Sequence, residues 1–150
     1  MKSTFYLPLL LIASIVTVSA ISGFKAKNQD EPWTSKQLFA PADLARIIND
    51  PTAKQPVIFS IGPSAIIKGS IDIGSVKEKE NLDKLTQELK TLPKDANIVI
   101  YCGCCPFEHC PNIRPAFKLL NEMKFINHKL LNLPKNIKVD WINKGFPVTN

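Results

Sequence analysis

The chain has 150 residues, 45% of them hydrophobic, and a formal net charge of +6 at pH 7. This length and composition predict one globular domain plus an N-terminal segment, and they exclude a disordered or low-complexity protein. The basic residues are scattered and have acidic neighbours, as in residues 77–80. Because nucleic-acid binding needs a concentrated basic surface, we expect no nucleic-acid partner.

The first 20 residues have the pattern of a secretory signal peptide. A start that contains Lys2 precedes an apolar run over residues 5–18, and Val18 and Ala20 suit positions −3 and −1 of a cleavage site. We therefore expect cleavage after Ala20, a mature net charge of +5, and a secreted or periplasmic protein. If the segment is retained, it is the one part of the chain expected to contact a membrane.

Residues 21–36 are polar and irregular and are predicted to form a linker, within which Trp33 is the earliest candidate for the folded part. The domain is predicted over residues 37–150. It opens with a short strand at 37–40 and a helix at 41–50, where Pro41 suits the first helical position because a proline lacks the N–H that this position leaves unpaired.

The remaining elements alternate between buried strands and amphipathic helices. Compact β-branched runs predict the strands, and leucine or isoleucine at helical spacing predicts the helices. The helix after the cysteines has Asn112 as its expected N-cap. The predicted strands are 56–62, 70–75, 97–101 and 129–133, and the predicted helices are 81–92, 112–123 and 136–144. This order predicts an α/β fold, with a mainly parallel central sheet and helices on both faces.

All four cysteines lie within nine positions, as Cys102, Cys104, Cys105 and Cys110. A disulfide-stapled scaffold spreads its cysteines along the chain, so this cluster indicates a site instead. Cys102 follows a predicted strand directly, at the edge where α/β sheets bind ligands. The loop runs into a helix N-terminus, whose positive potential lowers a thiol pKa. Cys102 is therefore the expected nucleophile, and a structural buried cysteine is the alternative.

Two other chemistries remain open for the same thiols. Oxidation could pair Cys105 with Cys110, or either of them with Cys102, whereas a bridge between the adjacent Cys104 and Cys105 would be strained. The spacing C-x-C-C-x4-C could also hold a metal with His109. Zinc sites usually draw cysteine pairs from separate segments, so soft Cu(I) would suit one loop better.

Four further residues are candidates for a substrate-binding loop: Gly103, Phe107, His109 and Arg114. His109 is either an acid–base group or a solvent-facing side chain beside Glu108. Arg114 either contacts an anionic substrate from the first turn of its helix or is a surface charge. His128, at the start of the last strand, is expected to be structural.

With these elements in place, the chain resembles the rhodanese-like domain family over residues 38–148. No single motif is specific, but several occur in the family's order. The matching segments are residues 57–62, the 68–75 segment similar to Gly-His-Ile-Pro-Gly-Ala, the strand and cysteine at 98–102, Phe125, and residues 140–148 with their closing Gly-Phe-Pro-Val.

This resemblance implies a rhodanese-like three-layer α/β fold and a sulfurtransferase or sulfur carrier without a cofactor. The thiolate of Cys102 would take sulfane sulfur from a small anionic donor such as thiosulfate, and cyanide or a thiol would remove it. A partner protein could take part. Cys104, Cys105 and Cys110 would serve as auxiliary thiols, and backbone amides of the loop would cradle the persulfide.

The chain also departs from the family pattern. Ser60 and Gly62 replace the Asp and Arg of the second strand, and Ser70 replaces the His of the Gly-His-Ile segment. The loop is longer and has three additional cysteines, so that counting back from the helix would make Cys110 the nucleophile in place of Cys102. A phosphatase-like site is disfavoured because Arg114 lies too far from Cys102. The remaining alternative is a non-catalytic cysteine-rich module that binds a soft metal or senses redox state.

Overall fold

Five strands form one parallel sheet in the computed structural model, which describes residues 31–149. They lie side by side in the order β1-β5-β4-β2-β3. The strands are β1 Leu38–Phe39, β2 Val57–Ser60, β3 Ser70–Asp72, β4 Ile98–Tyr101 and β5 His128–Leu131. The predicted α/β class and parallel sheet are confirmed. The expected signal peptide at 1–20 and residues 21–30 of the expected linker lie outside the described residues.

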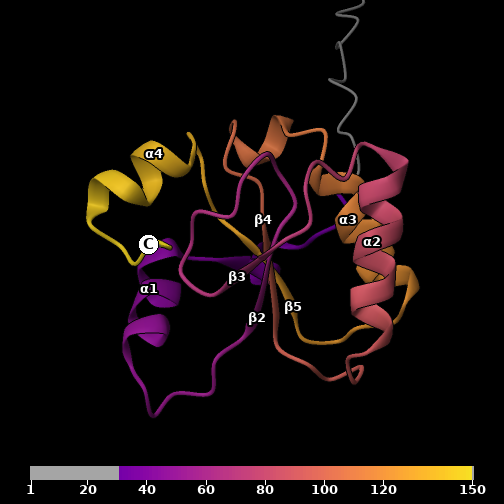
Figure 1. Cartoon of the computed structure of the whole chain (residues 1–150), viewed down its shortest axis with the longest axis horizontal. Coiled ribbons are helices and arrows are strands. Elements are labelled where there is room, and N and C mark those ends of the chain that lie inside the picture. Colours follow the sequence, from indigo (N-terminus) through magenta and orange to yellow (C-terminus); the bar gives the residue numbers. More distant parts are fainter. Residues whose placement is uncertain (1–30, 150) are drawn as a thin grey trace, which may run out of the picture.

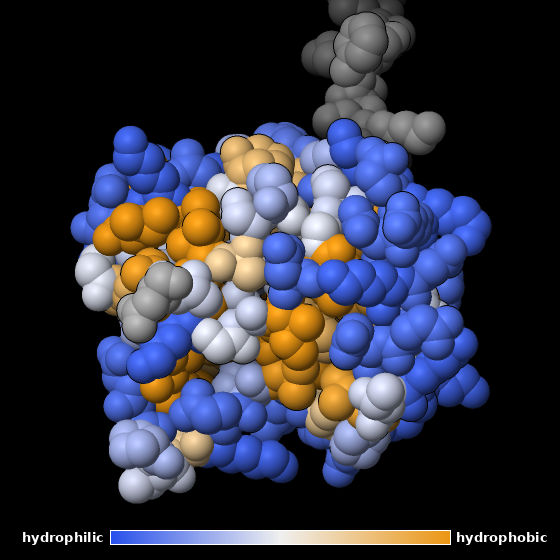
Figure 2. Space-filling model, viewed as in Figure 1, coloured by the Kyte–Doolittle hydropathy of each residue, from blue (hydrophilic) through white to orange (hydrophobic). Residues whose placement is uncertain are grey.

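Helices cover both faces of the sheet (Figure 1). The sheet residues that face α2 and α3 form one apolar cluster with them, and those that face α1 and α4 form a second cluster. Charged side chains cover the outer side of α2, which is hydrophilic in Figure 2. The helices are α1 Pro41–Asn49, α2 Lys79–Lys90, α3 Ile113–Glu122 and α4 Ile137–Asp140. Within residues 31–149, no helix combines the length and the apolar character needed to cross a membrane.

Strand β4 is the centre of the sheet and is buried along its whole length. Its side chains alternate between the two faces, as the pleat of a strand requires. Ile98 and Ile100 pack toward α2 and α3, whereas Val99 and Tyr101 pack toward α1. A strand that is buried on both faces has a continuous apolar sequence, and this strand could therefore be predicted from the sequence.

The C-terminal helix is shorter than the single helix predicted for residues 136–144, and that prediction is wrong. Helix α4 ends at Asp140, and a separate 3-10 turn follows at Ile142–Lys144. Trp141 lies between them with φ −129° and ψ −64°. Its ring is fully buried, and Nε1 donates to the Pro147 carbonyl at 2.9 Å. The non-helical backbone that accompanies this packing separates α4 from the 3-10 turn.

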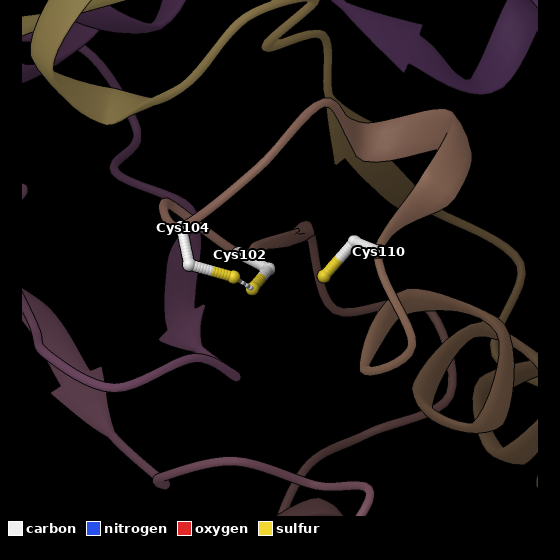
Figure 3. Close-up of side chains that lie close together, drawn as sticks. All are labelled: Cys102, Cys104 and Cys110. Carbon is white, nitrogen blue, oxygen red and sulfur yellow. Dashed lines mark hydrogen bonds between the residues drawn. The ribbon is translucent and has the colours of Figure 1, made fainter.

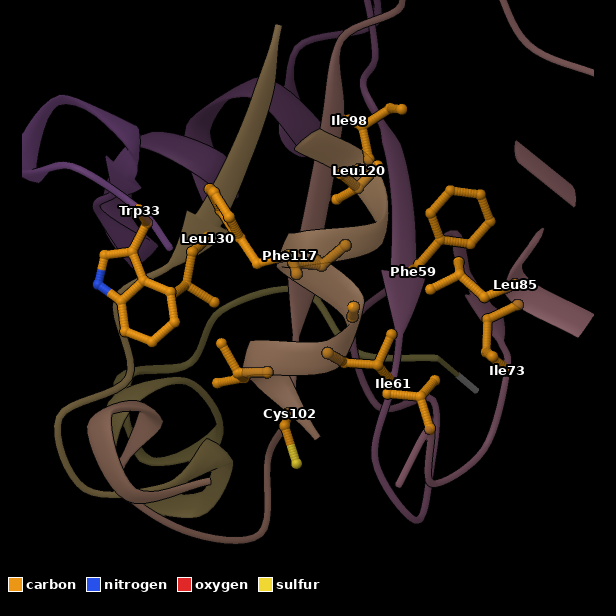
Figure 4. Close-up of a cluster of buried hydrophobic side chains, with 14 of the residues drawn as sticks. Trp33, Phe59, Ile61, Ile73, Leu85, Ile98, Cys102, Phe117, Leu120 and Leu130 are labelled. Atoms are coloured by element: carbon orange, nitrogen blue, oxygen red, sulfur yellow. The ribbon is translucent and has the colours of Figure 1, made fainter. Parts of the chain in front are cut away.

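Trp33, inside the segment expected to be a linker, is 8% exposed and belongs to the core (Figure 4). Its ring lies 5.7 Å from that of Phe117 in α3 and 6.1 Å from that of Phe107. The Arg114 guanidinium stacks over it at 5.5 Å and forms an ion pair with Glu31 at 2.6 Å. The segment at residues 31–33 is therefore part of the folded domain.

The Tyr101 hydroxyl organises the turn between β2 and β3. It accepts hydrogen bonds from the backbone N–H groups of Ile66 and Ile67 at 2.9 and 3.2 Å, and it lies 3.0 Å from Ser70 Oγ. The Tyr101 side chain is fully buried. Without that oxygen, the two N–H groups would lose their partner inside the protein, where water cannot easily replace it.

We predict that Tyr101→Phe lowers the free energy of unfolding by about 1–3 kcal/mol, because it leaves buried donors unpaired. Urea denaturation of the reduced protein measures this change. Ser70→Ala removes a single neighbour of the hydroxyl and is expected to cost less. Equal unfolding midpoints for Tyr101→Phe and the wild type would show that the hydroxyl does not hold this turn.

Candidate functional site

Cys102 follows β4 directly, at the carboxyl edge of the sheet. It is 1% exposed and lies at one end of the core cluster that packs against α3 (Figure 4). The chain then runs through a 3-10 turn at Phe107–His109 and enters α3 at Ile113. The expected strand–loop–helix arrangement around this cysteine is present.

Three of the four cysteines form a compact cluster, which we call the thiol cluster: Cys102, Cys104 and Cys110. Their sulfur atoms all lie within 4.8 Å of one another, and Cys102 Sγ is 3.3 Å from Cys104 Sγ (Figure 3). Cys102 and Cys110 are buried, whereas Cys104 is exposed. Cys105 Sγ contacts Cys104 Sγ at 3.3 Å but is not part of the cluster. All four thiols are free.

Asn112 holds the Cys102 thiol from the other end of the loop. Its Nδ2 donates to Cys102 Sγ at 3.4 Å. Its Oδ1 accepts from Ser75 Oγ and from the Lys77 backbone N–H, both at 3.0 Å. Because a backbone N–H can only donate, the amide oxygen must face Lys77 and the amide nitrogen must face the sulfur.

The prediction that Asn112 caps α3 is wrong as far as its side chain is concerned. Asn112 occupies the N-cap position, but it has helical dihedral angles, φ −81° and ψ −28°, and its side chain makes no capping hydrogen bond. Asn112 is 2% exposed, and its side chain forms hydrogen bonds with Ser75, Lys77 and Cys102 instead. Asn112 thus connects the segment before α2 to the candidate nucleophile.

The surroundings of Cys102 lower its pKa to about 5. The Cys110 thiol is the largest cause, because it acts as a hydrogen-bond donor to the thiolate. Burial opposes it, and the backbone N–H of Cys104, the Asn112 amide and the Cys104 thiol add to the lowering. Cys102 is therefore the member of the cluster that ionises first.

The partner thiols shift in the opposite direction. The Cys102 thiolate, followed by burial, raises the pKa of Cys110. Burial, followed by the hydrogen bond with Cys102, raises the pKa of Cys104 to about 12. One thiolate stabilised by two neutral thiols is the charge state that this arrangement favours, because neighbouring like charges repel each other.

Two glycines make room for the site. A Cβ atom on Gly62 would lie 2.8 Å from Cys102 Sγ, and a Cβ atom on Gly103 would lie 2.7 Å from Ile137 Cβ in α4. Parallel pairing of β2 with β4 matches Ser60 with Tyr101, which brings Gly62 beside the loop. Gly62 therefore leaves space for the thiol, and Gly103 lets the loop pack closely against α4.

The other departures from the rhodanese-like pattern also have structural roles here. Ser60 is buried and its Oγ donates to the Ser64 carbonyl at 2.8 Å. Ser70 Oγ donates to the Ile67 carbonyl at 2.7 Å and lies beside the Tyr101 hydroxyl. Both serines hold the turn between β2 and β3.

The remaining sequence candidates make other contacts. Phe107 is 5% exposed, packs against Trp33 and donates its N–H to the Leu133 carbonyl at 3.2 Å. His109 is exposed. The Arg114 guanidinium contacts Glu31 and donates to the Glu108 carbonyl at 2.8 Å. The contacts of Phe107 and Arg114 thus attach the loop to the segment at residues 31–33 and to the chain after β5.

His128 is buried between side chains from two elements, as expected of a structural residue. Its Nε2 lies 2.9 Å from Asn121 Oδ1 and 3.2 Å from Gln37 Nε2, and its ring packs 4.6 Å from that of Phe117. Burial lowers its pKa.

Comparison with known proteins identified no relative: no family model matches the chain, and no curated protein matches it. The rhodanese-like resemblance therefore remains a prediction from the motifs.

The sequence reasoning missed two functional positions, Gly62 and Asn112. Gly62 could have been found from the sequence. It ends one predicted strand, Cys102 follows another, and the carboxyl ends of adjacent parallel strands meet at one edge of a sheet. Asn112 had none, because its partners Ser75 and Lys77 lie more than 30 positions earlier in the chain.

The ionisation of Cys102 predicts a pH dependence of stability. Because its pKa is lower in the folded than in the unfolded protein, the free energy of unfolding should rise between about pH 5 and the ordinary thiol value of 9.0. Above that value, the raised pKa values of Cys104 and Cys110 act in the opposite direction. We predict that Cys102→Ala removes the Cys102 contribution to this rise, as measured by urea denaturation of both proteins over this range in reductant.

Subtracting the variant from the wild type at each pH cancels the contribution of His128, whose lowered pKa also destabilises the fold in acid. Parallel pH profiles for the two proteins would contradict the assigned thiolate.

The close approach of Gly62 to Cys102 predicts an energetic coupling. Gly62→Ala is expected to destabilise the protein by about 1–3 kcal/mol through overpacking. Adding Cys102→Ala should recover most of this loss, because it removes the sulfur that the new Cβ meets. Denaturation of the single and double variants measures the coupling.

Gly103→Ala is the matched control, because it creates an equally short contact but with Ile137. Neither Gly62 nor Gly103 has a positive φ, so alanine strains neither backbone. Two outcomes would disprove the direct contact between Gly62 and Cys102. In one, Cys102→Ala restores the stability lost in Gly103→Ala; in the other, it fails to restore the stability lost in Gly62→Ala.

Proposed function

We propose that the protein is a rhodanese-like sulfurtransferase or sulfur carrier that forms a persulfide on Cys102. The observation that carries this proposal is the placement of the Cys102 thiol at the carboxyl edge of β4, where the Asn112 amide donates to its sulfur. A thiolate is the nucleophilic form of cysteine, and the lowered pKa of Cys102 favours it at neutral pH.

The loading step follows from that thiolate. Cys102 Sγ attacks the outer sulfur of a small anionic donor such as thiosulfate, a new S–S bond forms, and the donor's S–S bond breaks. Sulfite leaves with the electron pair of the broken bond, so no external oxidant or reductant is needed. The donor that we infer is small and anionic, and the product is a persulfide anion that the Asn112 amide and the α3 N-terminus would stabilise.

Cys104 is suited to the unloading step. Cys102 is 1% exposed, whereas Cys104 is exposed and its sulfur is 3.3 Å away. The Cys104 sulfur would attack the outer persulfide sulfur and form a new S–S bond, while the S–S bond to Cys102 breaks. The Cys104 thiol would pass its proton to the Cys102 sulfur, which leaves with the electron pair of the broken bond. An acceptor such as cyanide, a small thiol or a partner protein would then find the sulfur at the surface.

Two features of the chain support the family assignment within this proposal. The strands and helices follow one another in the order that the resemblance requires, and the helices lie on both faces of the sheet. The rhodanese-like three-layer arrangement is part of the proposal, as is export through a signal peptide cleaved after Ala20. A secreted or periplasmic location would expose the site to extracytoplasmic sulfur donors.

Mass spectrometry after incubation of the reduced protein with thiosulfate tests the proposal. We predict that the wild type gains the mass of one sulfur atom on the peptide that contains Cys102, and that Cys102→Ala gains none. Cys110→Ala should still be labelled on Cys102, at a lower rate, because it removes the largest cause of the lowered pKa. Circular dichroism confirms that each variant is folded.

An adduct that persists on Cys110 in Cys102→Ala would reassign the nucleophile to Cys110. No adduct in the wild type with thiosulfate, a polysulfide or a small persulfide would refute sulfur transfer, and would favour a non-catalytic thiol module.

A further inference from the structure

The thiol cluster unites ligand atoms from both ends of one loop. Cys102 and Cys104 come from its start, and Cys110 comes from its end, immediately before α3. Their three sulfur atoms lie within 4.8 Å of one another, and Cys102 and Cys104 are 3.3 Å apart. Figure 3 shows the sulfur of Cys110 directed toward the other two. The sulfurs thus already surround one small volume.

The number and kind of ligands restrict which ion could occupy this volume. Among residues 31–149 the cluster includes neither a carboxylate nor an imidazole. Thiolate sulfur favours soft ions such as Cu(I), whereas zinc usually requires four ligands in a tetrahedron. Cys105 Sγ contacts Cys104 Sγ at 3.3 Å but does not lie within 4.8 Å of all three sulfurs, so it flanks the volume that they surround.

We propose that Cys102, Cys104 and Cys110 form a three-coordinate Cu(I) site. At a metal–sulfur distance of about 2.3 Å, three sulfurs placed in a plane around one ion lie about 4.0 Å apart. The Cys102–Cys104 separation of 3.3 Å is shorter than this value, and no pair of the three sulfurs is more than 4.8 Å apart. Small side-chain rotations would therefore complete the site.

Binding leaves the oxidation state of copper unchanged. Cu(I) replaces the thiol protons, which pass to solvent, and each thiolate provides an electron pair. The Asn112 amide donates to Cys102 Sγ and would orient this ligand, as outer contacts do in metal sites. The exposed Cys104 provides the route by which the ion enters, while Cys102 and Cys110 keep water away from it.

Anaerobic titration with Cu(I) in competition with a chromophoric Cu(I) chelator tests this proposal on the reduced full-length chain. We expect the wild type to remove one Cu(I) per chain from the chelator and to develop ultraviolet thiolate-to-copper absorption. Cys104→Ser, at an exposed position, and Cys110→Ser should each lose this one-to-one binding. Cys105→Ser is the matched control and should retain it.

Zinc provides the second arm of the experiment, read with a chromophoric zinc chelator. Tighter capture of Zn(II) than of Cu(I), relative to chelators of known affinity, would overturn the assignment of the ion. A loss in Cys105→Ser as large as that in Cys104→Ser would overturn the three-thiol geometry. No competition by the wild type would refute the site.

This inference is independent of sulfur transfer, and the two can fail separately. Cys110→Ser is expected to lose Cu(I) but to keep the persulfide on Cys102, whereas Cys102→Ala is expected to lose both. In the wild type, one equivalent of Cu(I) should prevent the sulfur adduct, since both reactions use Cys102 Sγ. An adduct that forms equally with and without bound Cu(I) would remove Cys102 from the ligand set.

Discussion

The parallel pairing of β2 with β4 is the constraint on which the site depends. Its register, with Ser60 opposite Tyr101, brings the carboxyl ends of the two strands together. Gly62 then lies against Cys102, and the absence of a side chain there leaves the volume that the sulfur occupies. Tyr101, the last residue of β4, holds the turn on the other face of the sheet through its hydroxyl. Tyr101 and Cys102, at the end of a strand that is buried along its whole length, therefore organise the site and its support.

The chemistry of the thiol cluster results from unequal environments for chemically identical groups. Cys102 receives donors from Cys110, Cys104 and Asn112, and its pKa falls, whereas burial and the nearby thiolate raise the pKa of both partner thiols. This separation of ionisation states is how one cluster can contain both a nucleophile and proton donors. Accessibility divides the same residues differently, because the most reactive thiol is buried and its neighbour Cys104 faces solvent. The reactive sulfur of Cys102 and the accessible sulfur of Cys104 are thus different atoms in van der Waals contact.

Much of the fold could be predicted from the sequence, because buried parallel strands and amphipathic helices leave periodic patterns. The position of Cys102 at a strand end followed from the same patterns. Local patterns could not show which thiols converge, since that depends on the 3-10 turn at Phe107–His109, which returns Cys110 toward β4. They also could not show that Asn112 contacts Lys77, because these residues lie 35 positions apart in the chain. Nor could they show that Trp141 interrupts a helix, because the burial of its ring depends on tertiary packing. Export and sulfur chemistry stay predictions from motifs.

The packing of Trp33 has a consequence for where the domain can be cut. Its ring touches Phe107, in the 3-10 turn of the cysteine loop, and Phe117, in the helix that follows the loop. Glu31 adds an ion pair to Arg114, which in turn binds the Glu108 carbonyl. The first residues of the domain, 31–33, therefore pack directly against the cysteine loop and the helix that follows it. A proteolytic trim or an expression boundary placed at Gln37, where the sequence pattern predicts the first strand, removes these contacts to the loop while leaving every cysteine in the chain.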